Sequence, residues 1–228
     1  MAPPGRAAST PAFPVLTTAV ATVTAAVSTA GLVAEPVLLA LRRDAAALSD
    51  GQLWRLLTAL LVQDGGVPGT VFNLLGLVLV GVAAEHRLGA RAWLAAYLTG
   101  GLTGELVGWA GWEPIGGGNS IGVCGLAGAL VVAVLRDARA PGRLETVAPA
   151  TWAAALTAST LTGFAPVVAG VVTGSAASTA PRVARGLPAV LVTVSAGLLL
   201  FQRDIHGAAL GTGLLAGVAF TARPPPAG

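Results

Sequence analysis

The chain has 228 residues, of which 54% are hydrophobic and only 10% charged, and its mean hydropathy is +0.79. Soluble domains carry about 25% charged residues because they need a polar surface against water, so this composition excludes an ordinary soluble protein. The net charge of +3 comes from arginines scattered in small groups at the ends of apolar stretches, which argues against a nucleic-acid partner. We expect an all-α, polytopic transmembrane helix bundle with at least six spans, embedded in a lipid bilayer.

The two ends of the chain differ from the apolar region between them. Residues 1–13 are rich in Pro, Ala and Ser and are expected to be a disordered cytoplasmic N-terminus, whereas 223–228 form a disordered proline-rich tail. The membrane domain then covers 14–222. Its first helix, Pro14–Ala34, is longer than the core of a cleaved signal peptide, which predicts a retained anchor. The charged segment 35–64 is expected to lie on or partly in the external interface.

The next predicted spans are 69–85, 91–109 and a helix that ends at Arg136. Arginines follow the second and fourth spans, which marks both loops as cytoplasmic by the positive-inside rule and places the N-terminus inside. Glu105 lies within the third span, where an ionisable residue is a candidate for function. Because it is near the external end, we expect its carboxylate to reach water; a polar lining of an active-site cavity is the alternative.

The apolar stretch 146–181 admits more than one topology. Two short crossings broken near Gly163 and Pro166 keep the following arginines inside, which the positive-inside rule favours over one crossing. A re-entrant or interfacial hairpin fits equally well. Helices over 186–202 and 205–220 follow.

Residues 118–122 match the G-x-S-x-G pattern of the nucleophile elbow. That motif belongs to an α/β sheet, with a strand before it and a helix after it, whereas here a polar loop precedes it and a membrane helix follows. This context excludes an α/β-hydrolase. What remains is Ser120 at a helix N-terminus, where free N–H groups and the helix dipole stabilise a developing oxyanion.

A nucleophilic serine needs a base, and the chain offers only His86 and His206. His86 lies in a charged cytoplasmic turn and is expected to be solvated. His206 opens the last helix, on the same external side as Ser120. Asp204 is not expected to be a third member, because positions i and i+2 on a helix do not share a face; a helix cap or an interfacial charge is the predicted role.

Small residues follow both candidate residues at helical spacing and predict close helix packing. They are Gly125 and Gly128 after Ser120, and Ala209, Gly213 and Gly217 after His206. Two such smooth faces would bring Ser120 and His206 together. The single cysteine, Cys124, lies in the same apolar run and is expected in the core.

These residues, taken in order, resemble the rhomboid intramembrane serine proteases over roughly 54–217. The matching positions are Trp54-Arg55, Asn73, Glu85, Gly89, Gly118-x-Ser120, Gly125-Leu126, His206 and Gly213. The resemblance implies a six-helix core in which Ser120 is the nucleophile and His206 the general base, without an acidic third member. It also implies that Asn73 and the backbone N–H of Ser120 bind the oxyanion. The implied substrates are membrane-anchored proteins cut in or near their transmembrane segment, with no cofactor and no metal.

Two positions depart from the family pattern. Gly69 stands where the family has a histidine, and Ile121 where it has a glycine after the serine. Losing one oxyanion donor costs about 10²- to 10³-fold in rate, so Asn119 or a loop amide is a candidate replacement. The alternative role for Asn119, and the commoner one, is a helix cap. The stretch 146–181 is also longer than a six-helix core requires and suggests an extra hairpin.

The departures keep two alternatives open. One is a catalytically inactive rhomboid-like protein that binds transmembrane helices without cutting them; the other is a transporter or unrelated scaffold, for which Glu105 is the main argument. Retention of Ser120, His206 and Asn73 favours the protease. The alanine-rich, lysine-free composition suggests a bacterial source and therefore a plasma-membrane location.

Overall fold

The computed structural model describes residues 13–160 and 186–222 of the chain. Residues 1–12 and 223–228, expected to be disordered, lie outside the described residues, as does 161–185 with the predicted break near Gly163 and Pro166. The described part is almost entirely helical, which confirms the predicted all-α bundle.

The elements follow the sequence prediction closely. The first half contains α1 (Val15–Val33), α2 (Glu35–Leu41), β1 (Arg43–Asp44), α3 (Ala45–Ser49), α4 (Arg55–Thr58), α5 (Gly66–Leu88) and α6 (Ala90–Val107). The second half contains the π-helical turn η1 (Gly108–Trp112), β2 (Ile115–Gly116), α7 (Ser120–Arg136), α8 (Arg143–Ser159), α10 (Gly186–Phe201) and α11 (Ile205–Thr221). The predicted spans agree with these bounds to within a few residues, and α8 shows that the first part of 146–181 is helical.

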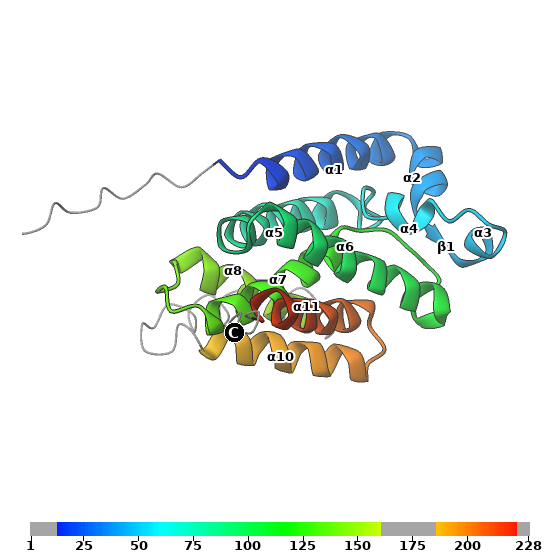
Figure 1. The fold of residues 1–228 in the computed structure, drawn as a ribbon. Coiled ribbons are helices and arrows are strands. Elements are labelled where there is room, and N and C mark those ends of the chain that lie inside the picture. The colour runs from blue at the N-terminus through cyan, green and yellow to red at the C-terminus, as the bar shows by residue number, and fades with distance from the viewer. Residues whose placement is uncertain (1–12, 161–185, 223–228) are drawn as a thin grey trace, which may run out of the picture.

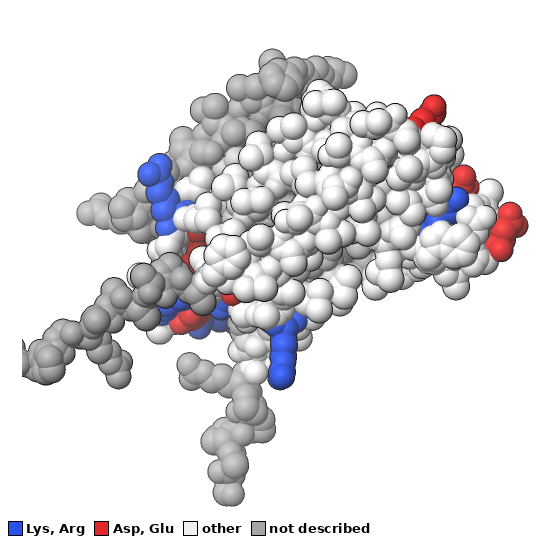
Figure 2. All heavy atoms as spheres, turned by 90° about the horizontal axis from the view of Figure 1, so that it is seen from above, with Lys and Arg blue, Asp and Glu red and all other residues white. Residues whose placement is uncertain are grey.

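The long helices run side by side, and the short elements α2, α3, α4 and β1 gather at one end of the bundle (Figure 1). Among the described residues, two helices, α1 and α5, are long and apolar enough to cross a membrane by themselves, and α7, α10 and α11 are shorter apolar helices. In the face shown in Figure 2, charged side chains lie toward the two ends, with a wide uncharged band between them. Such a band is what a bilayer requires of its contact surface.

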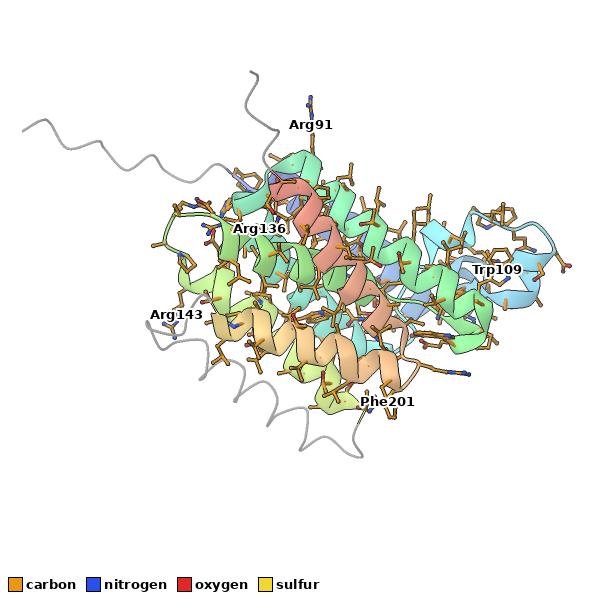
Figure 3. All side chains as sticks on the ribbon, turned by 60° about the horizontal axis from the view of Figure 1, so that its bottom comes forward. Arg91, Trp109, Arg136, Arg143 and Phe201 are labelled. Carbon is orange, nitrogen blue, oxygen red and sulfur yellow. The ribbon has the colours of Figure 1, made fainter. Side chains whose placement is uncertain are left out.

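The two ends of the bundle carry different residues. Arg91, Arg136 and Arg143 lie at one end, and Trp109 and Phe201 lie at the other (Figure 3). The short elements between α1 and α5 belong to the second end (Figure 1). By the positive-inside rule the end that carries Arg91, Arg136 and Arg143 is expected to be cytoplasmic, and this orientation stays a prediction.

Helix α7 is the centre of the bundle and packs against α5, α6, α8, α10 and α11. Every residue from 120 to 134 is buried, as expected of a helix that is apolar on all sides. Its contact with α11 depends on glycine: a Cβ added to Gly213 would lie 2.3 Å from the carbonyl oxygen of Gly125. The predicted smooth faces therefore do meet, backbone against backbone.

The charged residues of the segment 35–64 suggested that it lies in the membrane interface, but two of its arginines do not. Arg43 and Arg55 are buried inside the protein rather than facing water or headgroups. Arg55 donates to the backbone carbonyls of Leu39 and Arg42, both at 2.8 Å, and so ties this segment together. Trp54 is 55% exposed, as expected of an interfacial side chain.

Candidate active site

Ser120 is the first residue of α7, and hydrogen bonds to neighbouring segments hold the loop that leads into this helix. The short strands β1 and β2 pair antiparallel, with Arg43 opposite Gly116. The Gly118 N–H donates to the Ala59 carbonyl at 2.9 Å, and the Gly117 N–H donates to Asp64 at 3.0 Å. These bonds fix the approach to the helix, so Ser120 is placed by backbone rather than by its own side chain.

His206 lies directly against Ser120. Its Nε2 is 2.8 Å from Ser120 Oγ, although the two residues are 86 positions apart. The contact follows from the α7–α11 packing, because both side chains stand at the N-terminal ends of helices that approach through Gly125 and Gly213. The separation lies within the range of about 2.6–3.2 Å that links a nucleophile to its base.

Asp204 contacts the other side of the same ring, which corrects the expectation that it lies away from His206. Its Oδ1 is 2.6 Å from His206 Nδ1 and also accepts the His206 backbone N–H at 2.8 Å. The rule for positions i and i+2 applies inside a helix, whereas Asp204 precedes α11 with extended backbone angles, φ −84° and ψ 132°. The cap role was predicted correctly; the ring contact was not.

The environment of Asp204 favours its ionised form. Burial acts to raise the pKa of the Asp204 carboxyl, but the hydrogen bond from the His206 ring, the charge of His206 and the bond from its backbone N–H together outweigh burial. The pKa therefore lies below its ordinary value.

Asn73 reaches the site from α5 and is held by a residue that the sequence did not single out. Its Nδ2 donates to Gln63 Oε1 at 2.6 Å, and Gln63 Nε2 in turn donates to Asn119 Oδ1 at 2.7 Å. A Cβ at Gly118 would lie 3.2 Å from Gln63 Oε1, 3.3 Å from Ser120 Oγ and 3.4 Å from Asn73 Nδ2, so these three polar atoms border the same small space. No periodicity or motif in the sequence marks Gln63, which is 2% exposed.

Asn119, which the sequence suggested as an oxyanion donor, makes its side-chain contacts with Gln63 and with the backbone of α5. It occupies the N-cap position of α7 without a side-chain cap bond and is completely buried. Its oxygen accepts from Gln63, and its Nδ2 lies 3.5 Å from the Asn73 carbonyl oxygen, to which it donates. Its amide is thus used inside the protein, between Gln63 and α5.

Ser120, His206 and Asn73 line a cavity of about 240 Å³, and α8 contributes Leu156 and Ser159 to its wall. Glu105 also lines this cavity, but it is 0% exposed and paired with Arg43 at 2.9 Å. The expectation that its carboxylate reaches water is therefore wrong, and the alternative of a polar cavity lining fits the structure. Glu113 also lines the cavity, and its carboxylate lies 3.7 Å from the Arg43 guanidinium.

The two departures from the family pattern have different surroundings. The position of Gly69 is open, because an added Cβ would meet nothing within 4 Å. Ile121 is buried against Gly104, where a Cβ would lie 2.8 Å from Ile121 Cγ2. The bulk of Ile121 is thus accommodated by a glycine on α6. His86 is exposed and Cys124 is buried in the core, both as predicted.

Two comparisons with known proteins bear on this site. Residues 50–222, more than half of the chain, match the Rhomboid domain. A Bacillus subtilis (strain 168) protein named "Rhomboid protease GluP" is 32% identical over 90 residues, which make up 40% of this chain. The alignment spans 18% of that protein's own length.

Proposed function

This chain belongs to the rhomboid family of integral membrane proteins, and we propose that it is an intramembrane serine endopeptidase in which Ser120 is the nucleophile and His206 the general base. The observation that carries the proposal is the 2.8 Å contact between Ser120 Oγ and His206 Nε2 beside a cavity. A protein that only binds helices does not need a serine hydroxyl held on a histidine ring.

The contact supports a two-step acyl transfer. Ser120 Oγ attacks the scissile carbonyl carbon as its proton passes to His206 Nε2, forming a tetrahedral oxyanion. The C–N bond then breaks, and His206 gives that proton to the leaving amine. In the second step water, deprotonated by His206, attacks the acyl ester, and its proton passes back to Ser120 Oγ when the ester bond breaks.

The oxyanion is assigned to two donors. The Asn73 amide donates one N–H to Gln63, and its second N–H is assigned to the oxyanion in the space beside Gly118. The backbone N–H of Ser120 is in the first turn of α7, where N–H groups lack intrahelical partners. In this proposal Asn119 positions Gln63 instead of binding the oxyanion. Preorganised donors of this kind are each worth about 10²- to 10³-fold in rate.

The proposed substrates are membrane-anchored proteins cut in or near their transmembrane segment. An apolar groove of about 470 Å³ runs between α5 and α8 and shares Phe72 with the Ser120 cavity. A transmembrane helix seated there would present its external end to the serine. The proposed location is the bacterial plasma membrane with the N-terminus in the cytoplasm, supported by the arginines at the end of the bundle opposite Trp109 (Figure 3).

Labelling with a fluorophosphonate serine probe tests the assignment. Purified protein in detergent should label at Ser120, and the label should disappear in Ser120→Ala and fall at least about 10³-fold in His206→Ala, as when a base is lost from such a pair. His86→Ala is the matched control, because this exposed histidine lies on α5 at the other end of the bundle. A folded wild-type protein that stays unlabelled would instead support the inactive, helix-binding alternative.

A further inference from the structure

We propose that Asp204 is a positioning residue that holds the His206 imidazole for proton transfer, so that the site works as a Ser–His–Asp triad rather than a pair. The inference rests on the proposed function. It goes beyond the resemblance, which implies a serine and a histidine without an acidic member.

The local fold places the carboxylate where a third member must stand. Helix α10 ends in a turn in which Arg203 takes a positive φ of 57°, and the Asp204 N–H donates to the Leu199 carbonyl at 2.9 Å. This bond reverses the chain before α11 begins at Ile205. A non-glycine residue in the left-handed region is strained, so the surrounding structure must hold this turn in place.

The hydrogen bonds also decide which nitrogen carries the proton. An ionised carboxylate accepts hydrogen bonds and cannot donate, so Nδ1 of the neutral ring carries the hydrogen that points to Asp204. Nε2 is then unprotonated and accepts from the Ser120 hydroxyl, which is the tautomer that a general base needs. The lowered pKa of Asp204 keeps the carboxylate charged when His206 becomes an imidazolium.

Other charged groups around the ring do not take this role. Glu113 is close enough to interact electrostatically with His206, but its ion-pair partner is Arg43 at 3.7 Å. Asp64 and Glu105 line the same cavity, where Asp64 accepts from the Gly117 N–H and Glu105 from Arg43. Within the described residues, Asp204 is the carboxylate hydrogen-bonded to the His206 ring.

Two substitutions distinguish a positioning role of Asp204 from a role only as the N-cap of α11. Asp204→Asn keeps an oxygen that accepts both the backbone N–H and Nδ1–H of His206 but removes the charge. Asp204→Ser keeps a cap acceptor but is too short to support the ring. We expect the labelling rate to fall at least about tenfold in Asp204→Asn, because an adjacent opposite charge changes a protonation equilibrium constant by about 10- to 10³-fold. Asp204→Ser should lose about 10²-fold or more.

Asp44 supplies the control, because it is also an N-cap aspartate, accepting from Ala46 and Ala47 at the start of α3, with no histidine beside it. Asp44→Asn should label like wild type. If Asp44→Asn and both Asp204 variants stay within threefold of wild type, Asp204 is only a cap and the proposal fails. If the Asp204 variants lose labelling at a temperature where they are still folded and Asp44→Asn does not, the positioning role stands.

A spectroscopic measurement separates this proposal from the proposed function. The chain has only two histidines, so ¹⁵N spectra of His86→Ala protein report the His206 ring directly. We expect the Nδ1–H tautomer in wild type and a mixture in Asp204→Ser. Wild type with this tautomer but without probe labelling would refute the protease assignment and keep the Asp204 contact; an unchanged tautomer ratio in Asp204→Ser would refute the positioning role.

Discussion

Substituting Gly213 by alanine should damage the site from a distance, because this glycine sets the spacing of α7 and α11. The added Cβ would lie 2.3 Å from the Gly125 carbonyl oxygen, whereas ordinary van der Waals contact begins at 3.4 Å. The helices must therefore separate by about 1 Å at this point. His206 is seven residues away on the same helix, or about 10 Å along its axis, so the displacement reaches the ring.

We expect two measurable losses from Gly213→Ala. Overpacking of this size costs about 1–3 kcal/mol of stability and should lower the unfolding temperature in detergent. A 1 Å displacement of reacting groups costs about 10²-fold in rate, so fluorophosphonate labelling of Ser120 should slow by that factor at a temperature where the variant is still folded.

Gly211 provides the matched control on the same helix, because a Cβ there would meet nothing within 4 Å. Gly211→Ala should label at the wild-type rate and unfold at the same or a slightly higher temperature, since alanine favours a helix over glycine by about 1 kcal/mol. The reasoning is refuted if Gly213→Ala matches Gly211→Ala in both measurements.

Three further predictions concern polar side-chain contacts. Glu105→Gln removes the closer, buried charged partner of Arg43, whose side chain is 1% exposed, and leaves it only the half-exposed Glu113 at 3.7 Å; it should cost about 3–5 kcal/mol by thermal unfolding. Arg43→Met combined with Glu105→Leu should recover most of that loss, and equal losses would contradict the pairing. The pKa of Asp204 is lowered from 3.8, so its stabilising effect is complete above pH 3.8 and is lost as the pH falls through the lowered value. The unfolding temperature of Asp204→Asn should therefore fall less steeply than that of wild type below pH 3.8, and parallel curves would count against this linkage. Gln63→Leu removes the acceptor of Asn73 and should slow probe labelling at least about tenfold, within the range for a lost oxyanion donor; an unchanged rate would show that Asn73 needs no such support.

The sequence predicted the elements of the bundle well because the bilayer imposes a simple rule. Long apolar stretches between charges must form helices, since backbone groups in lipid have no other partners. The same logic placed Ser120 at a helix N-terminus and His206 at the start of the last helix, and the small residues on both helices predicted their contact. These signals are local and need no knowledge of distant partners.

The contacts that sequence reasoning missed depend on tertiary structure or on one backbone turn. Glu105 meets Arg43 across 62 positions, so its position near a helix end suggested water instead of an ion pair. Gln63 is a single polar residue with no pattern around it. Asp204 was judged by helical geometry, although the turn at Arg203 ends one helix before it and the next begins after it.

The most direct test of the central claim is cleavage of a membrane-anchored substrate in liposomes. Purified protein would be reconstituted with a model protein carrying a single transmembrane segment, and the products would be identified by mass spectrometry. We predict a cut in or near the transmembrane segment by the wild-type protein and none by Ser120→Ala or His206→Ala. Cleavage that persists in folded Ser120→Ala would contradict the assignment of Ser120 as the nucleophile.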